Sequence, residues 1–578
     1  MKVIIIGIDG GSWDLLMPWV KANKLKSLAA LISGGTIARL RSTFPPITGP
    51  AWASFATGRQ PGNTGIFEFY WRDDESYSIH TINRKTMQGK SLWQLLSEAG
   101  KTSVVINVPM TFPAEEVQGA IVAGMLTPSK NSKGFTHPED LFEKCGLDKD
   151  AYMIMPPHHI SWYDGKIEKL KSDLLQMIEQ RKLVALRLLE SINWDFFMVH
   201  FYATDYAQHA FWRLVDTNSP LYDATEASKY GHVMLEIFKV VDNSIAEILK
   251  QIDLSETNVL IVSDHGFGPT YRFINICAWL QNLGLLKINP ISTEQVVSRI
   301  IDRLASKVKL DDHTTLTSFF KSLAIGPYKV SPRVIRRLED MALIKIMKRY
   351  KRLGAIAGIN VFHPFERIDW SNTKAYTIGT CGLIYINLKG REPHGIVLPG
   401  AEYEELREYL IEEFYKLTDE QGNKLIDKVY RKEEIYSGEC LDKAPDLIPV
   451  TEKKVCYFYP ALDCNDIVTL PSSYRSGNHR LDGIFIASGP AIQRGATLDN
   501  IRIYDIAPTV LYLMGVSVPE SMDGRILVEC VRQEVLDSLP IQYSSKVDTV
   551  IEYSPDEGLS KEEVKLVQER LKGLGYVD

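Results

Sequence analysis

Residues 2–11, KVIIIGIDGG, decide how the rest of the chain is interpreted. The run from Lys2 to Ile8 is apolar, continuous and rich in β-branched residues, which is typical of a strand buried on both faces. Asp9-Gly10-Gly11 follows at once and predicts a turn at the carboxyl end of that strand. In sheets of parallel strands, ligands bind beyond the carboxyl ends, so Asp9 is a candidate site residue.

Strands and amphipathic helices alternate through the following 250 or so residues. We predict strands at 102–108, 194–201 and 258–263, and helices at 25–33, 51–56, 91–99, 166–191 and 222–252. This alternation favours a mostly parallel sheet with helices on both faces. Asp205 and Asp264 each lie just after a predicted strand, as Asp9 does. We therefore expect these three carboxylates at one shared site.

The second half is less regular. Residues 284–360 are rich in Lys and Arg and predict a helical insertion, either with a solvated basic face or acting as a cap over the substrate. Strand pattern resumes at 374–387, with a helix at 403–416 and a strand at 483–487. A surface helix is expected at 560–575, opened by Ser560 as a cap. We predict a catalytic domain of residues 1–283 and 361–530, the insertion 284–360, and a C-terminal tail of 531–578.

Composition narrows the class of protein. The chain has 578 residues, 45% hydrophobic and 24% charged, which is ordinary for a soluble globular protein. A net charge of −6 argues against a nucleic-acid polymer or an anionic membrane as partner. No run of about 18 apolar residues predicts a membrane span, and the apolar start is too short for a secretory signal. Seven scattered cysteines without a CxxC spacing suggest reduced thiols, so we expect a cytoplasmic location.

Three segments carry candidate metal ligands. Asp205 and His209 are four residues apart, which on a helix puts both on one face. Asp264 and His265 begin the loop DHGFG, whose alternative reading is a polar turn. His479 lies in the loop NHRLDG, where by itself it would more often be a surface histidine.

With Asp9, the set has three carboxylates and three imidazoles and suits two divalent cations of the zinc or manganese type. Two such cations can hold the attacking and leaving oxygens of a phosphoester in an in-line displacement.

Thr48 is the candidate nucleophile. It follows the rigid loop TFPPI of residues 43–47 and lies at or just before a predicted helix start. The simplest interpretation is a helix N-cap, yet the same position favours an anionic phosphate, so the two roles are compatible. Thr43 and Thr57 are the competing hydroxyls. Thr43 precedes the Pro45-Pro46 pair, and Thr57 should lie at the far end of the helix.

The order of these motifs resembles the type I phosphodiesterase/nucleotide pyrophosphatase family of the alkaline phosphatase superfamily. The motifs are IGIDGGSWD, PPITGPAWASFATGRQPGNTGIF, TDYAQH, SDHGFG and GNHRLDG, and the resemblance covers about residues 1–280 and 370–520. It implies a three-layer α/β/α sandwich with a helical insertion, and hydrolysis of a small phosphoester, with a nucleotide as one option.

The resemblance also implies a role for each site residue. One cation would be held by Asp9, Thr48, Asp264 and His265, and the second by Asp205, His209 and His479, with Thr48 attacking phosphorus. Both cations would be zinc, with manganese as the alternative.

Other readings stay open. The loop TGPAW lacks the CxPxR pattern of sulfatases, and a threonine at 48 argues mildly against a phosphoglycerate mutase. Phe69 stands where nucleotide pyrophosphatases have an asparagine, which questions nucleotide specificity. Phe69, Tyr70 and Trp71 could stack on a planar group or simply pack. A phosphomonoesterase or phosphoryl-transfer enzyme would want a cationic clamp, for which the candidates are Arg59, Arg475 and Arg480. A non-catalytic metal-stabilised binding protein is the third alternative.

Overall fold

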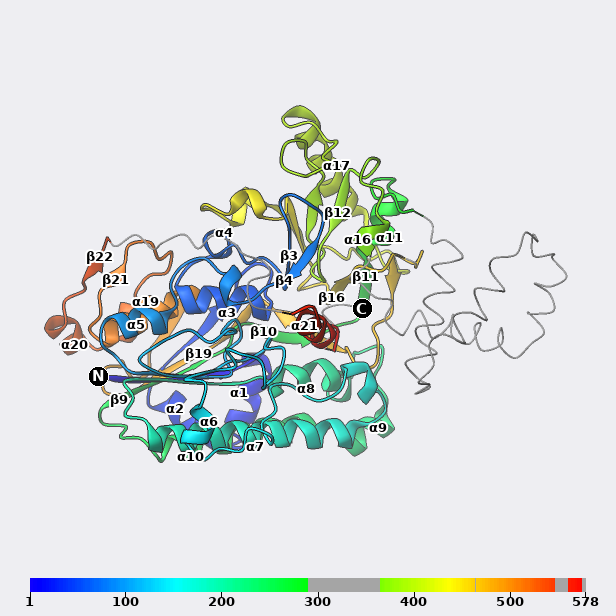
Figure 1. Ribbon diagram of the computed structural model, residues 1–578. Helices are drawn as coiled ribbons and strands as arrows, with labels where there is room; N and C mark the ends of the chain where they lie inside the picture. The colour runs from blue at the N-terminus through cyan, green and yellow to red at the C-terminus, as the bar shows by residue number, and fades with distance from the viewer. Residues whose placement is uncertain (290–363, 463, 546–559, 574–578) are drawn as a thin grey trace, which may run out of the picture.

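The computed structural model describes residues 1–289, 364–462, 464–545 and 560–573, and its core is a nine-stranded sheet (Figure 1). The order is β20-β2-β19-β9-β1-β8-β5-β6-β7. In chain order the strands are β1 (Lys2–Ile8), β2 (Thr36–Arg41), β5 (Ser103–Ile106), β6 (Gly119–Val122), β7 (Thr136–His137), β8 (Phe196–Phe201), β9 (Thr257–Val262), β19 (Asp482–Ser488) and β20 (Thr497–Arg502). β1 pairs in parallel with both β8 and β9, whereas β19 runs antiparallel to β9 and β2. The predicted mostly parallel sheet is confirmed.

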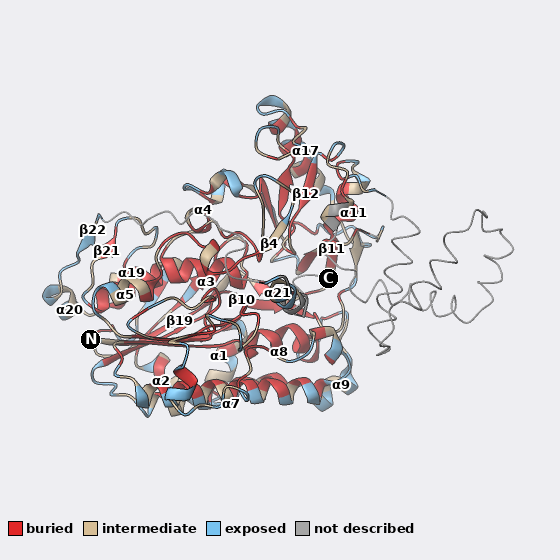
Figure 2. Ribbon diagram, viewed as in Figure 1, coloured by how far each residue is buried: buried red, intermediate tan, exposed pale blue. Residues whose placement is uncertain are grey.

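Helices cover both faces of this sheet, which gives the three-layer sandwich of the alkaline-phosphatase-like fold. One face carries α1 (Trp13–Lys21), α2 (Lys26–Ser33), α7 (Ile167–Ser191) and α10 (Val233–Leu249); the other carries α3 (Thr48–Thr57), α5 (Leu92–Glu98) and α19 (Ile506–Leu513) (Figure 1). Figure 2 shows the buried strands between the two helical layers, with α3 buried throughout and α7 exposed along its outer side. The continuous apolar runs of β1, β8 and β9 are thereby buried on both sides.

Two predicted helices differ from the structure. The segment 222–252 is not one helix: α9 (Ala224–Tyr230) ends before α10 begins at Val233. Gly231 lies between them, and a Cβ there would stand 2.6 Å from the Ala227 carbonyl oxygen. The helix predicted at 51–56 begins earlier, at Thr48, with Ile47 in the N-cap position. Thr48 is therefore the first helical residue and not the cap.

A smaller unit stands beside the sandwich, at the top of Figure 1. It contains a four-stranded sheet in the order β12-β13-β15-β14 and a three-stranded sheet in the order β16-β11-β17. The strands are β11 (Arg272–Asn275), β12 (Ala375–Thr377), β13 (Ile384–Ile386), β14 (Lys428–Arg431), β15 (Leu447–Val450), β16 (Cys456–Tyr459) and β17 (Val468–Thr469), with helices α11 (Ile276–Asn282) and α17 (Ala401–Lys416) against them. The strand pattern at 374–387 thus forms a separate sheet. Most of the predicted insertion 284–360 lies outside the described residues, and the domain division remains a prediction.

Buried polar contacts fasten the smaller unit to the sandwich. Glu68, fully buried, accepts hydrogen bonds from the backbone N–H groups of Thr380 and Phe69, both at 2.9 Å. Burial raises the pKa of the Glu68 carboxyl to about 7. The Tyr436 hydroxyl donates to the carbonyl oxygen of Phe44 at 2.6 Å. These contacts hold the smaller unit next to the loop that leads into α3.

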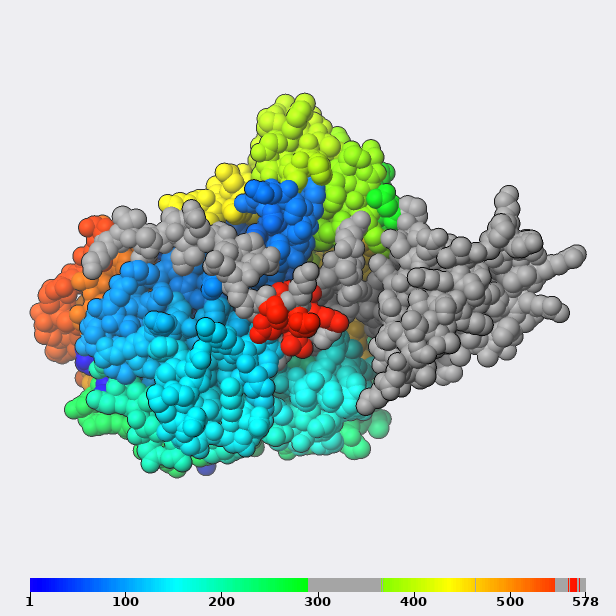
Figure 3. Space-filling view, in the orientation of Figure 1, coloured from blue at the N-terminus to red at the C-terminus, as the bar shows by residue number. Residues whose placement is uncertain are grey.

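The predicted C-terminal helix is present as α21 (Lys561–Gly573). Ser560 caps it as expected, because its hydroxyl accepts from the Glu563 N–H and its own N–H donates to the Glu563 carboxylate. The helix buries Val567 and Leu571 and contacts β4 (Ile79–Thr81), which pairs antiparallel with β3 (Tyr70–Arg72). Figure 3 shows α21 between this β3–β4 hairpin and the sandwich. Across the described helices, including α7 with 25 residues, none is both long and apolar enough to cross a bilayer.

Candidate metal centre

Three neighbouring strands bring the three carboxylates together. β9, β1 and β8 are adjacent in that order, and Asp264, Asp9 and Asp205 follow at or near their carboxyl ends. All three are fully buried. The turn after β1 is tight: Gly10 has φ +67° and its N–H donates to Asp264 Oδ1 at 3.2 Å. A Cβ at Gly10 would come within 2.8 Å of the Phe267 ring, so this close approach needs glycine.

Asp205 and His209 lie on α8 (Ala203–Phe211), which begins directly after β8. Their spacing of four residues puts the His209 Nε2 3.5 Å from Asp205 Oδ1, as the sequence predicted for one face of a helix.

His479 arrives from far along the chain. It belongs to β18 (Gly477–Arg480), which pairs antiparallel with β10 (Gly266–Pro269) directly after His265. This two-stranded ribbon stacks the His479 ring on the His265 ring, with centroids 3.7 Å apart. His479 Nε2 lies 3.1 Å from Asp205 Oδ1.

Two sets of three candidate ligands result, and within each set the atoms that could bind a cation lie within 4.8 Å of one another. One set is Asp9, Asp264 and His265, and the other is Asp205, His265 and His479. His265 belongs to both, whereas the family resemblance gave it to the first only. His209 borders the second set, because its Nε2 lies 3.1 Å from that of His479.

The imidazoles are held in one tautomer. His209, His265 and His479 each place Nδ1 about 3 Å from a backbone carbonyl oxygen, of Gly477, Gly266 and Pro46 respectively. A carbonyl can only accept, so each Nδ1 carries the proton and each Nε2 lone pair faces the cluster. Burial lowers the pKa of His209 to about 3, and lowers those of His265 and His479 well below their usual value. All three side chains are neutral at neutral pH and could act as ligands.

The cluster fits divalent cations because its acceptors face one another. The Nε2 atoms of His209 and His479 lie 3.1 Å apart, and both face Asp205 Oδ1, at 3.5 and 3.1 Å. One oxygen of each carboxylate, Asp9 Oδ1, Asp205 Oδ2 and Asp264 Oδ2, is buried without a hydrogen-bond donor. Within the described part of the chain, none of the three carboxylates pairs with Lys or Arg. Positive charge at the centre would satisfy all of these atoms.

Protons compete with cations for this cluster. Burial, with the neighbouring Asp264 and Asp205, raises the pKa of Asp9 well above its usual value. Burial, with Asp205, raises the pKa of Asp264 to about 8. In the metal-free protein Asp264 therefore holds a proton at pH 6 that a cation must displace, and the raised pKa of Asp9 acts in the same direction.

We therefore expect the affinity of metal-free protein for Zn²⁺ to rise between pH 6 and pH 8, by about tenfold per pH unit for each proton displaced. Calorimetric titration in two buffers of different ionisation enthalpy counts the released protons. The histidines add little to this slope because they are already neutral. Equal affinity at the two pH values, with no proton release, would show that the carboxylates do not bind the metal.

His200 is a site residue that the sequence reasoning missed. It is fully buried in β8, with Nδ1 3.1 Å from the Asn107 carbonyl oxygen and Nε2 2.9 Å from Asp9 Oδ2. One proton lies between Nε2 and Oδ2, and burial lowers the pKa of His200 to about 3, which puts that proton on Asp9 in the metal-free protein. This bond turns the other Asp9 oxygen towards the cluster. Gly7 makes room for the ring, since a Cβ there would lie 2.9 Å from His200 Cδ2.

Replacing His200 with phenylalanine keeps a ring in this space and removes the bond to Asp9. We expect a 10–100-fold weaker metal affinity, as for other partners that orient a ligand. Equilibrium dialysis against a zinc-buffered series measures it. The control is His232→Phe, at the exposed N-cap residue of α10. Unchanged metal affinity in a folded His200→Phe protein would show that His200 does not orient Asp9 for metal binding.

Thr48 lies against the cluster at the start of α3. It is fully buried, and its Oγ1 is 3.4 Å from His265 Nε2. The competing hydroxyls are bonded elsewhere: Thr43 donates to the Pro45 carbonyl, and Thr57, the last residue of α3, donates to the Ala53 carbonyl. Of the three, Thr48 alone is in contact with a candidate ligand.

The position of the family asparagine lies beside Thr48. Phe69 is fully buried, and a Cβ on Gly49 would meet its ring at 3.3 Å. The phenyl ring therefore packs against the first turn of α3, which agrees with the packing alternative for this aromatic. It offers no hydrogen bond to a phosphate oxygen.

The three candidate arginines for a cationic clamp lie in different surroundings. Arg480 donates to the carbonyls of Asn478, His479 and Pro269, which fastens the β10–β18 ribbon. Arg59 packs alongside Gly89. Arg475 is buried with its guanidinium over the Tyr457 ring at 4.3 Å, and its charge contributes to the lowered pKa of both His209 and His479. Arg475 is thus the best placed of the three.

A mostly parallel sheet with carboxylates and imidazoles clustered at the carboxyl ends of its central strands is typical of a hydrolase of the alkaline-phosphatase-like fold. The family model for type I phosphodiesterase / nucleotide pyrophosphatase matches residues 3–326, more than half of the chain. The chain belongs to this family, whose members act on small phosphoester or nucleotide substrates. The match includes Thr48 and every candidate metal ligand except His479, which joins the site through the β10–β18 pairing. No curated protein matches the chain.

Proposed function

We propose that the protein hydrolyses a phosphodiester or pyrophosphate bond at two divalent cations through a covalent phospho-Thr48. The observation that carries this proposal is the Thr48 hydroxyl, held 3.4 Å from His265 where both ligand sets meet. Binding alone would not require a buried hydroxyl there. Zinc is the proposed metal, with manganese as the alternative, because oxygen and nitrogen ligands accept either.

Bound cations would supply charge for the phosphate oxygens and lower the pKa of a hydroxyl at the site. The chain's own residues do the rest. Thr48 Oγ1 forms a bond to phosphorus as the bond to the leaving oxygen breaks, and water later releases the phosphoryl group and restores Thr48. Asp9, Asp264 and His265 hold one end of the centre, and Asp205, His209 and His479 the other. Burial of the cluster keeps bulk water from these charges.

Hydrolysis of bis(p-nitrophenyl) phosphate, compared with p-nitrophenyl phosphate, tests this proposal. Protein reloaded with zinc or manganese should prefer the diester, and chelator-treated protein should not turn over either ester. Preference for the monoester would favour the second candidate, a phosphomonoesterase with Arg475 as cationic clamp. Absence of turnover with two metals bound would favour a binding protein.

A cytoplasmic location is part of the proposal. All seven cysteines are free thiols in the structure, as expected of a protein from a reducing compartment.

A further inference from the structure

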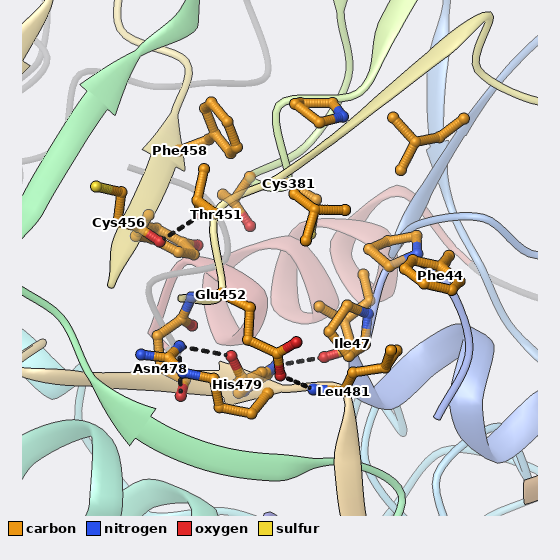
Figure 4. Close-up of a pocket in the computed structure, with 18 residues that line it drawn as sticks. Phe44, Ile47, Cys381, Thr451, Glu452, Cys456, Phe458, Asn478, His479 and Leu481 are labelled. Carbon is orange, nitrogen blue, oxygen red and sulfur yellow. Dashed lines mark hydrogen bonds between the residues drawn. The ribbon is translucent and has the colours of Figure 1, made fainter. Parts of the chain in front are cut away.

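A pocket opens directly beside the candidate metal centre (Figure 4). His479, Asn478 and Leu481 lie at its base, and Phe44 and Ile47, from the loop before Thr48, line one side. The smaller unit closes the opposite side with residues of β15 and β16 and the turn at Cys381. His479 Nδ1 donates to the Pro46 carbonyl at 3.0 Å, so one hydrogen bond joins the base to the nucleophile loop.

Most of the lining is apolar. Phe44, Ile47, Ile448, Val450 and Phe458 contribute side chains. The two thiols in the lining, Cys381 and Cys456, are neutral, because burial raises the pKa of Cys381 well above its usual value and that of Cys456 to about 12. Displacing water from such a surface favours an apolar ligand group.

The charged side chains of the lining, Arg480 and Glu452, are already bonded within the protein. The Arg480 guanidinium donates to three backbone carbonyls. Glu452 accepts from the Leu481 N–H at 2.5 Å, and the Thr451 hydroxyl donates to the Cys456 carbonyl at 2.8 Å. The described lining therefore offers no uncommitted cation for a second phosphate, and Glu452 would repel one.

We infer that this pocket holds an uncharged, apolar substituent of the substrate, so that the natural substrate is a phosphodiester with an alkyl or aryl group. This inference rests on the proposed function, since it deepens the specificity of the same site. It goes against a nucleoside polyphosphate, whose additional phosphates would need a cationic partner in this pocket. His479 is the candidate ligand that lines this pocket, so an apolar group bound there would be adjacent to a phosphate held at the cations.

Direct binding tests the inference without turnover. Zinc-loaded Thr48→Ala protein is titrated calorimetrically with dimethyl, dibutyl and bis(glyceryl) phosphate, which are symmetric and fit either orientation. We expect dibutyl phosphate to bind at least about tenfold more tightly than the other two, given the apolar area of three extra carbons. Equal binding of the dimethyl and dibutyl esters, or tighter binding of the glyceryl ester, would overturn the inference.

Filling the pocket provides the second arm. Val450→Trp should weaken dibutyl binding about tenfold and leave dimethyl binding unchanged, so that misfolding, which would weaken both, is recognised. Leu398→Trp, an exposed position of the smaller unit, is the control. Unchanged dibutyl binding in Val450→Trp would contradict the inference. Failure of the proposed function would instead appear as absence of nitrophenyl ester turnover in the wild type, whatever the diester affinities.

Discussion

Thr48→Ala is expected to lower kcat for bis(p-nitrophenyl) phosphate by at least about 10³-fold, because it removes the attacking oxygen while the rest of the site remains. Thr48→Ser should keep measurable activity, since it retains a hydroxyl at the first position of α3. Steady-state kinetics with metal content measured on the same samples separates loss of the nucleophile from loss of metal.

Thr57→Ala is the matched control for this result. It removes a buried hydroxyl from the last residue of the same helix, 10 residues long, without touching the cluster. Activity within about twofold of wild type is expected for a change of this kind. Full activity in Thr48→Ala would mean that water attacks phosphorus directly.

His265→Ala should have the largest effect on metal binding, because this imidazole belongs to both ligand sets. We expect affinity at both positions to fall by at least about 100-fold, more than for loss of an orienting partner. Asp205→Asn touches one set only, so it should leave one tight metal per chain. Metal analysis after dialysis against a zinc buffer gives the stoichiometry.

Comparing His265→Ala with Asp205→Asn distinguishes a ligand shared by both sets from a ligand of one set. If His265→Ala retained two tightly bound metals, the shared position of this ring would have no functional meaning. If Asp205→Asn lost both metals, the two sets would not be separate sites. His232→Ala, at an exposed histidine, controls for general effects of histidine loss.

Much of the sandwich could be predicted from local pattern. The β-branched runs that became β1, β8 and β9 are long, continuous and buried, and the polar residues after them mark the functional edge. The smaller unit was harder, because β12 and β13 have three residues each and carry no reliable period. Strand β13 pairs with β15, which lies about 60 residues further along the chain, and the pattern of a single sequence cannot reveal such a pairing.

In the candidate site, the sequence pointed to six candidate ligands and Thr48, which the structure brings together, but not to how the candidates group. His265 meets His479 only because β10 pairs with β18 across more than 200 residues. His200 was hidden inside an apolar strand. The available signal for His200 was the presence of a histidine in the apolar strand β8. Gly7 of β1, which lies opposite His200 in the sheet, makes room for its ring.

The stereochemical course at phosphorus tests the central claim most directly. A nitrophenyl phosphorothioate diester of one configuration at phosphorus is hydrolysed by the zinc-loaded protein in ¹⁸O-labelled water. The configuration at phosphorus of the ¹⁸O-labelled product is then determined. Attack by Thr48 followed by attack of water makes two in-line displacements, so the account predicts net retention. Net inversion would mean a single displacement by water and would contradict a covalent phospho-Thr48.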